Sequence, residues 1–399
     1  MLRKKYHELL AHLPKRELTV LIGARQTGKS TLLKQLAEAL TASGETVVSL
    51  NLERRDVLLD LNQSPEHIFK YLPAGSNRRS VALIDEVQYL DDPTNFLKLL
   101  YDEHADRLKI VATGSSAFYI DRQFKDSLAG RKKIFELQTL DFEEFLLFRG
   151  QDTELLELQR LRSGEVEKSV AEPRLWAALE TYLTYGGYPA VVLENETRHK
   201  VERLHDLKDS FVKRDILESG VTDETKFYRL MMLLAAQIGN LVNTNELANT
   251  LQITHATTDH FLYVLQKCFH LGLVRPFYQN LRKELVKMPK AYFLDLGLRN
   301  VLVNYFAPLE QRPDKGALLE NYAFRRLTER YAQDQIKFWR TADGNEVDFV
   351  VEETAFGGRA IEAKFSPAEA KPNKYRKFTE AYPQFPLEFW AWGDRGLLG

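Results

Sequence analysis

The sequence predicts a multidomain α/β protein. The chain has 399 residues, which is long for one ordinary domain, and 44% of them are apolar, enough to bury two or three separate cores. Mostly apolar runs of strand length, at residues 18–22, 81–84 and 110–112, each lead into small or charged residues. Strands that end in this way, the first followed by an amphipathic helix, are typical of an α/β domain.

The overall composition excludes several classes of protein. Lys and Arg number 55 and Asp and Glu number 56, a formal net charge of -1, so any contact with a nucleic acid must come from local patches. The single cysteine, Cys268, lies in an apolar run and is expected to be a buried small residue. Because there is no disulfide framework, signal-peptide core or apolar run of membrane length, we expect a cytoplasmic protein without a membrane partner.

A glycine-containing loop joins a strand to a helix in "LTVLIGARQTGKSTLLKQLAEAL". Gly23 and Gly28 allow the loop to point its N–H groups at phosphate oxygens, and the helix N-terminus adds partial positive charge. This is the P-loop pattern, in which Lys29 reaches the β- and γ-phosphates of ATP and the Ser30 hydroxyl binds Mg²⁺. A chance match in a glycine-containing turn is disfavoured by the strand and helix context. The expected nucleotide-binding residues are Gly23, Ala24, Arg25, Gln26, Thr27, Gly28, Lys29, Ser30 and Thr31.

Two further strands are expected beside this loop. "SVALIDEVQYL" at residues 80–90 ends in Asp85, which would hold Mg²⁺ through water, and Glu86, which would orient and deprotonate the attacking water. An Asp-Glu pair in a solvated loop is the alternative. "KIVATGSS" ends in Thr113, Ser115 and Ser116. If this strand lies between the other two, Thr113 or Ser115 would sense the γ-phosphate, although small polar residues also simply end strands.

These segments, in this order, resemble the AAA-type branch of P-loop ATPases, with "TVVSLNLE" as an additional strand. The segments "SLAGRKKIFELQTLDFEEFLLFRG", "YLTYGGYPAVVL", "FVKRDIL", "PKAYFLDLGLRN" and "GALLENYAF" are similar to a prokaryotic family in which an AAA-type ATPase is fused to a C-terminal domain of unknown function with a nuclease-like fold. In that comparison Arg131 is a candidate γ-phosphate or intersubunit arginine. A surface arginine after a glycine turn is the alternative. If Arg131 completes a neighbour's site, the chain forms a homo-oligomer such as a hexameric ring.

The middle of the chain is predicted to be helical. Residues 151–175 are charged and poor in aromatics, which indicates an exposed helix or insertion that ends the first domain. The helix that follows carries Arg214 and Asp215, either a surface ion pair or an element that couples to the ATPase.

Residues 223–290 predict three helices and a strand hairpin. One helix ends near Gly239, a short helix covers 246–251, a longer helix covers 255–269, and "GLVRPFY" and "RKELVKMPKAYFL" supply the strands. This is the order of a helix-turn-helix with a wing. Because the third helix is poor in Lys and Arg and carries Asp259, base readout is doubtful, and packing or protein contact is the alternative. The DNA-binding interpretation uses His255, Thr257, Thr258 and His260 for bases and Arg275, Arg282, Lys283 and Lys287 for phosphates.

A third group of charged residues lies near the end of the sequence. In "RAIEAKF" strand alternation puts Glu362 and Lys364 on one face, and Asp348 precedes Glu362 by 14 residues, a spacing that suits a hairpin. With Glu320 on an upstream helix, this set resembles the PD-(D/E)xK nuclease superfamily, although Val347 precedes Asp348 where many relatives have proline. The resemblance implies that Asp348 and Glu362 bind Mg²⁺, that Lys364 activates water or steadies the transition state, and that Glu320 assists.

A structural ion pair at a sheet edge is the alternative for Glu362 and Lys364, and a nuclease-like domain can also grip DNA without cutting it. The residues expected to line such a grip are Trp339, Arg340, Lys371, Lys374, Arg376 and Lys377, the last four of which are otherwise a solvated charged face.

The sequence therefore predicts four parts: an AAA-type P-loop ATPase domain (residues 1–150), a helical connector (151–222), a winged-helix domain (223–290) and a nuclease-like α/β domain (291–399). We expect ATP hydrolysis that drives remodelling of, or translocation on, duplex or branched DNA. One alternative is an ATP-gated, Mg²⁺-dependent nuclease, and another is a nucleotide switch that acts on protein partners.

Overall fold

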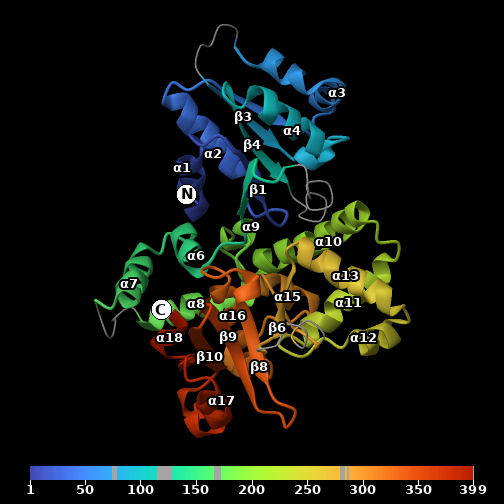
Figure 1. Ribbon diagram of the computed structural model, residues 1–399. Helices are drawn as coiled ribbons and strands as arrows, with labels where there is room; N and C mark the ends of the chain where they lie inside the picture. Colours follow the sequence, from blue (N-terminus) through green and yellow to red (C-terminus); the bar gives the residue numbers. More distant parts are fainter. Residues whose placement is uncertain (74–78, 115–127, 166–171, 279–283, 285–286, 399) are drawn as a thin grey trace. The chain divides into compact units, whose positions relative to one another are not determined.

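The computed structural model describes residues 1–73, 79–114, 128–165, 172–278, 284 and 287–398, with only the backbone for 211–218 (Figure 1). It divides into two compact units. One is formed by Met1–Gln138 with the short segments Arg214–Gly220 and Lys267–Phe269, and the other by the remaining residues. Each unit has a sheet of its own.

The sheet of the first unit is parallel and has the order β2-β3-β4-β1-β5. The additional strand β2 therefore lies at one edge, and β4 separates β1 from β3. The elements of this unit are α1 (Lys4–His12), β1 (Leu18–Ile22), α2 (Lys29–Ala42), β2 (Val47–Asn51), α3 (Arg55–Gln63), η1 (Pro65–Tyr71), β3 (Ser80–Asp85), η2 (Val87–Tyr89), α4 (Pro93–His104), β4 (Leu108–Gly114) and β5 (Lys132–Glu136).

Helices cover both faces of this sheet (Figure 1). Alternation along β1 sends Val20 into a core with α3 and α4, and sends Leu21 into a second core with α1 and α2. All residues of β3 and β4 are buried, as expected of central strands that are covered twice. The α/β architecture that the sequence predicts for this part is confirmed, and the structure shows that its sheet is parallel.

The second unit begins with helices. The helix α6 starts at a capping box, in which the Asp141 carboxylate accepts from Glu144 N (2.8 Å) and the Glu144 carboxylate accepts from Asp141 N (3.3 Å). Its helices up to the sheet are α6 (Phe142–Phe148), α7 (Asp152–Ser163), α8 (Glu172–Tyr185), α9 (Pro189–Val192), α10 (Thr197–Ser219), α11 (Glu224–Ala236), α12 (Thr244–Leu251) and α13 (His255–Lys267).

The sheet of the second unit is mixed, with the order β11-β10-β9-β8-β6-β7. Its strands and the helices among them are β6 (Leu271–Pro276), β7 (Lys290–Phe293), α15 (Leu296–Leu302), η3 (Leu309–Gln311), α16 (Lys315–Leu327), η4 (Gln333–Gln335), β8 (Ile336–Arg340), β9 (Glu346–Thr354), β10 (Gly357–Lys364), η5 (Pro367–Glu369), η6 (Pro372–Tyr375), α17 (Arg376–Ala381), β11 (Leu387–Ala391) and α18 (Arg395–Leu398).

Two of the domain boundaries expected from the sequence, at residues 150 and 290, differ from the observed units. The long N-terminal segment of the first unit ends at Gln138. Helix α6 is expected to belong to the first domain, but it lies in the second unit and packs through Phe142 and Phe145 against Tyr182 of α8. The hairpin β6–β7, expected to be a wing, joins the C-terminal strands because β6 pairs with β8 at Arg275 and Lys337. Strand pairing between distant segments has no signal in either segment alone, so a single sheet replaces the expected break at residue 290.

Two further expectations can be compared with the structure. Cys268 is buried, with 3% of its surface exposed, as predicted. None of the described helices is both long and apolar enough to cross a membrane.

Candidate functional site

The loop between β1 and α2 has the backbone of a phosphate-binding turn. Gly28 has φ +98°, and Gly23 has φ +153° with a position where a Cβ atom would lie 2.1 Å from the Leu137 oxygen. Both positions therefore require glycine. Within the loop, the Thr27 hydroxyl donates to the Ala24 oxygen at 2.9 Å.

Lys29 begins α2 and turns back into the loop. Its side chain is buried, and Nζ donates to the carbonyl oxygens of Gly23 (2.9 Å) and Ala24 (2.8 Å). The ammonium is therefore held on the inside of the curve, next to the first N–H groups of the helix. This arrangement places positive charge where a phosphate chain binds at a helix N-terminus.

Hydrogen bonds join the ends of strands β3 and β4, which carry Asp85 and Thr113. The Thr113 hydroxyl donates to Asp85 Oδ1, and Glu86 N donates to Thr113 Oγ1 at 3.0 Å. Glu86 has a left-handed backbone (φ +61°), and its Oε2 accepts from the Gln88 amide. The expected position of β4, between the loop strand and the acid strand, is confirmed, whereas Ser115 and Ser116 lie outside the described residues.

The donor set next to the loop fits a magnesium ion. Ser30, exposed on the first turn of α2, offers a hydroxyl, and Asp85 at the end of β3 offers a carboxylate. Hydroxyl and carboxylate oxygens are the hard ligands that Mg²⁺ prefers, with phosphate oxygens and water completing its shell.

An arginine near the start of the chain also holds the loop. Arg3 is 7% exposed, and its guanidinium donates to the Thr27 oxygen (2.7 Å) and to the Gln138 oxygen (2.8 Å). Nothing in the sequence identifies Arg3 as part of the site, because a single arginine before a helix matches no phosphate-binding pattern.

Arg131 lies just before β5, paired with an acid of its own chain. Its Nε donates to Asp102 Oδ1 at 2.7 Å and its Nη2 to Oδ2 at 3.2 Å. This hydrogen bond lowers the pKa of Asp102. The contact is the one expected of a surface arginine, and a role at a γ-phosphate or between subunits stays a prediction.

The helices expected to form a helix-turn-helix include one residue that does not suit base contact. Thr258 is fully buried and its hydroxyl donates to the Thr254 oxygen at 3.2 Å, so its predicted place at a base edge is wrong. His255 pairs with Asp259 at 2.9 Å on the exposed side of α13. Among the other predicted contacts, Arg275 and Lys287 are exposed, Thr257 and His260 are partly buried, and Arg282 and Lys283 lie outside the described residues.

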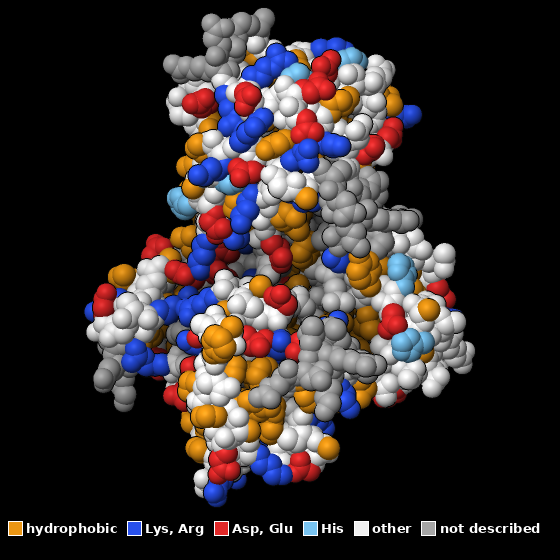
Figure 2. Space-filling model, in the orientation of Figure 1, with side chains coloured by type: hydrophobic (Ala, Val, Ile, Leu, Met, Phe, Trp, Pro, Cys, Tyr) orange, Lys and Arg blue, Asp and Glu red, His pale blue; other side chains and the backbone are white. Residues whose placement is uncertain are grey.

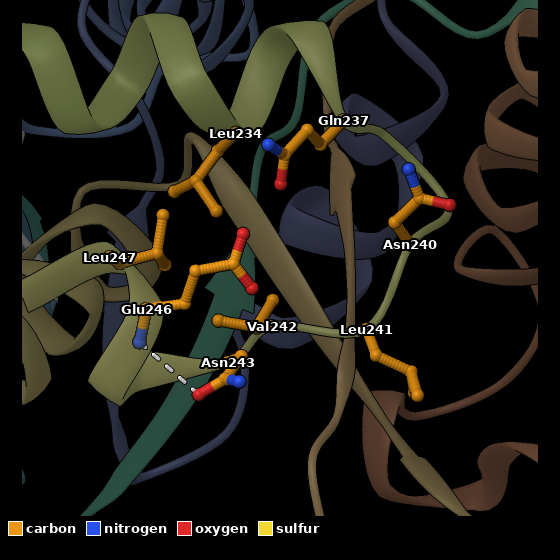
Figure 3. Close-up of a pocket in the computed structure, with 8 residues that line it drawn as sticks. All are labelled: Leu234, Gln237, Asn240, Leu241, Val242, Asn243, Glu246 and Leu247. Carbon is orange, nitrogen blue, oxygen red and sulfur yellow. Dashed lines mark hydrogen bonds between the residues drawn. The ribbon is translucent and has the colours of Figure 1, made fainter. Parts of the chain in front are cut away.

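A small pocket lies between α11 and α12 (Figure 3). It has a volume of about 10 Å³, room for about one water molecule, so it is not a ligand site. The figure also shows Asn243 capping α12, where its oxygen accepts from Glu246 N. The lining residues are Leu234, Gln237, Asn240, Leu241, Val242, Asn243, Glu246 and Leu247.

The C-terminal residues Asp348, Glu362 and Lys364 come together as the hairpin spacing predicts. Strands β9 and β10 are antiparallel, and each acid accepts from the opposite strand: Asp348 Oδ2 from Ala363 N at 2.9 Å, and Glu362 Oε2 from Asp348 N at 3.1 Å. Lys364 Nζ donates to Glu362 Oε1 and to the Ala363 oxygen (3.1 Å), and lies 4.0 Å from Asp348 Oδ2.

Glu320 on α16 is bound by a second lysine. Lys290 is 2% exposed and pairs with Glu320 (2.9 Å) and Glu346 (2.6 Å), while the Tyr292 hydroxyl also donates to Glu320 (2.5 Å). Alternation in "KAYF" puts Lys290 and Tyr292 on one face of β7, but nothing in this segment indicates that Glu320 is their partner.

The electrostatics of this cluster reflect burial and crowding of charge. Burial, and then the carboxylates of Glu320 and Glu362, raise the pKa of Asp348 well above its usual range. Burial alone would lower the pKa of Lys290, but Glu320, Asp348 and Glu346 raise it overall. The ammonium is therefore the stable form inside the cluster.

The three acids of this cluster do not fit a shared metal ion. Among the described residues, three ligand atoms come within 4.8 Å of one another only at Glu66, Glu103 and His104. Glu320, Asp348 and Glu362 therefore do not converge as three ligands. At the Glu66 group, Arg107 donates to His104 Nδ1 (3.0 Å), which leaves the proton of a neutral ring on Nε2 and removes the lone pair a metal needs.

Three family models match three successive segments of the chain. Residues 15–146 match a family model described as an AAA domain. Residues 177–309 match a domain of unknown function (DUF8612), and residues 315–390 match another (DUF4143). Residues 15–146, which contain the parallel sheet, are therefore similar to an AAA domain, and the winged-helix and nuclease-like identities of the later parts stay predictions.

Two relatives among curated proteins are both described as uncharacterized proteins. One from Haemophilus influenzae is 27% identical over 345 residues, which cover 84% of this chain and 79% of the relative. One from Methanocaldococcus jannaschii is 24% identical over 344 residues, which cover 84% of this chain and 72% of the relative.

Solved structures overlap only partly with this chain. The Walker-type ATPase of Pyrococcus abyssi has a TM-score of 0.48 and 17% identity, and the match covers 75% of this chain and 95% of that one. The ORC2 protein of Aeropyrum pernix in its ADP form has a TM-score of 0.34 and 14% identity, covering 68% and 87%. With TM-scores below 0.5, these likenesses carry no argument about function.

Proposed function

We propose that this chain binds ATP with Mg²⁺ and hydrolyses it at the loop between β1 and α2. The observation that carries the proposal is the order β3-β4-β1, because it brings Asp85, Glu86 and Thr113 to the same edge of one parallel sheet as the P-loop. Ligands of open parallel sheets bind at this carboxyl edge. The AAA domain match over residues 15–146 supports the same reaction.

Each residue has a distinct task in the proposed reaction. The loop N–H groups and Lys29 bind the phosphates and hold them in line for attack. Ser30 and Asp85 would hold Mg²⁺, which when bound would supply positive charge against the β- and γ-phosphate oxygens. Glu86 accepts the proton of the attacking water, with the Gln88 amide fixing the direction of its carboxylate.

Substitutions test these tasks separately. Lys29→Ala should weaken ATP binding and turnover together, while Glu86→Gln should leave ATP bound and lower turnover by about 100-fold or more. Lys34→Ala, on the exposed side of α2, is the matched control and should keep the wild-type rate. Phosphate release measures the turnover of all three variants, and titration of a fluorescent ATP analogue measures their binding. An unchanged rate in Glu86→Gln would contradict the assignment of the base.

We further propose that DNA, duplex or branched, is what the hydrolysis acts on. The supporting feature is a short run of exposed cations across η6 and α17: Lys371, Lys374, Arg376 and Lys377. Arg376 pairs with Glu380 (2.6 Å) and Lys377 with Asp343, so Lys371 and Lys374 are the first candidates for phosphate contact. Acidic and basic side chains are mixed over the face in Figure 2, so binding would depend on such local groups.

The DNA proposal is tested by the rate of hydrolysis. Duplex, single-stranded and four-way junction DNA should each be titrated at low salt, and a rise in the ATPase rate with intact strands supports a DNA motor. A Lys371→Glu, Lys374→Glu double variant should need more DNA for half the stimulation. If no DNA form binds and nucleotide is released slowly, the chain is instead a switch for protein partners.

A further inference from the structure

We propose that two lysines, Lys290 and Lys364, are the built-in counter-ions of the C-terminal acidic cluster, which therefore needs no divalent cation and does not hydrolyse DNA. The cluster consists of Glu320, Glu346, Asp348 and Glu362 with these two lysines. The proposal concerns a different site from the ATPase and does not rest on it.

Lys364 lies where the two strand acids meet. Its ammonium donates to Glu362 Oε1 and to the Ala363 carbonyl oxygen at 3.1 Å, and it is 4.0 Å from Asp348 Oδ2. Asp348 and Glu362 are the two acids that the nuclease resemblance assigns to Mg²⁺. A metal ion bound by both would have to displace the ammonium from between them.

The ammonium of Lys290 is held inside the cluster more firmly than the ammonium of Lys364. The Lys290 side chain is 2% exposed against 20% for Lys364, and its Nζ is fixed by Glu320 (2.9 Å) and Glu346 (2.6 Å) and lies 5.5 Å from the centre of the Phe338 ring. An ammonium this deeply buried is stable only while its carboxylate partners stay with it. Glu320 is therefore committed to an internal ion pair.

The hydroxyl groups of two tyrosines complete this arrangement. Tyr292 donates to Glu320 Oε1 (2.5 Å), the oxygen that Lys290 contacts, and Tyr375 donates to Glu362 Oε1 (2.7 Å), the oxygen that Lys364 contacts. Each of these carboxylates thus receives a lysine and a tyrosine on one oxygen. Protein donors take the place of metal and water at both acids.

A third cation lies at the edge of the cluster, where Arg340 pairs with Glu346 at 3.0 Å. When all four carboxylates are ionised, Lys290, Lys364 and Arg340 together balance three of them. A divalent ion that entered without displacing one of these cations would leave the group with a net positive charge.

The decisive measurement is binding of Mn²⁺ to the full chain without nucleotide, followed by the electron paramagnetic resonance signal of free Mn²⁺. Wild-type protein and Asp348→Asn should bind Mn²⁺ equally, because the cluster contributes no site. Lys364→Met removes the ammonium that lies between Asp348 and Glu362, so this variant should gain a site at least tenfold tighter, and adding Asp348→Asn should abolish it. Lys226→Met, a partly exposed lysine of the same unit, is the control and should gain nothing.

Opposite results would overturn the proposal. If wild-type protein holds Mn²⁺ more tightly than Asp348→Asn, the cluster is a metal site as it stands. This comparison does not depend on the folding of Lys364→Met, which denaturant unfolding of that variant measures. Incubation of wild-type protein with supercoiled plasmid and Mg²⁺ or Mn²⁺ should leave the plasmid intact, and nicking that disappears in Lys364→Ala would equally refute the proposal.

Discussion

Replacement of Arg3 by alanine should loosen the P-loop from outside the phosphate-binding motif. The Arg3 guanidinium donates to the Thr27 oxygen at 2.7 Å and to the Gln138 oxygen at 2.8 Å, and the side chain is 7% exposed. A hydrogen bond from a charged group contributes about 1.5–3 kcal/mol, and a buried carbonyl that loses its donor carries a further desolvation cost. We therefore expect the first unit to lose about 2–4 kcal/mol of unfolding free energy.

The same change should weaken nucleotide binding. Thr27 lies inside the loop. Without the hydrogen bond from Arg3 to the Thr27 oxygen, the loop has more conformations, and ATP binds to only a fraction of them. If half of the expected loss, about 1.4 kcal/mol, appears in binding, the Kd of ATP rises about tenfold. Titration of a fluorescent ATP analogue, together with denaturant unfolding, measures both quantities.

Two controls separate support of the loop from general damage. Arg3→Lys keeps a charge and at least one of the two hydrogen bonds, so it should recover part of the affinity. Lys5→Ala removes only an exposed ion pair with Glu8 and should match the wild type. If Arg3→Ala unfolds more easily but binds ATP within twofold of the wild type, the guanidinium stabilises the fold without positioning the P-loop, and the reasoning is wrong.

Three further predictions follow from the first unit. Thr113→Val keeps the strand but removes the hydroxyl that contacts Asp85 and Glu86, so turnover measured by phosphate release should fall at least tenfold while ATP affinity changes little. Arg131→Ala should leave single-chain ATP affinity unchanged; if Arg131 acts in a neighbour's site, the ATPase rate will lose its dependence on protein concentration. Lys109 is 1% exposed, and burial lowers its pKa to about 8. The unfolded chain therefore binds more protons between about pH 8 and pH 10.5, and the unfolding free energy of the wild type relative to Lys109→Met should rise across this window by about 1–3 kcal/mol, measured by denaturant unfolding. A flat difference would show that Lys109 is charged in the folded protein over the whole range.

The parts of the fold that the sequence predicts well are those with local patterns. The P-loop needs Gly23 and Gly28 for backbone reasons that the structure bears out in their positive φ values. Strand alternation places Glu362 and Lys364 together, because a period of two is a property of one strand. The place of β4 between β1 and β3 is the condition under which Thr113 is expected near the γ-phosphate, and the strand order of the sheet meets it.

The parts that the sequence could not predict depend on partners from distant segments. Lys290 is an ordinary lysine in its own segment and becomes part of the cluster only because β7, α16 and β9 bring Glu320 and Glu346 to it. Arg3 contacts Gln138 across 135 positions of the chain. The position of Thr258 on its helix predicts a contact with DNA, but the structure buries this side chain fully.

The two candidate sites differ in what holds their acids, and this difference connects the two proposals. In the first unit Asp85 accepts from the neutral Thr113 hydroxyl, and Lys29 turns its ammonium toward the carbonyls of the loop. In the C-terminal cluster Glu320 and Glu362 each accept from a lysine. An acid held by neutral donors keeps its negative charge available for a divalent ion, whereas an acid paired to a buried ammonium has already been neutralised. The sites should therefore respond to Mg²⁺ in opposite ways: the ion enables chemistry at the first and finds no place at the second.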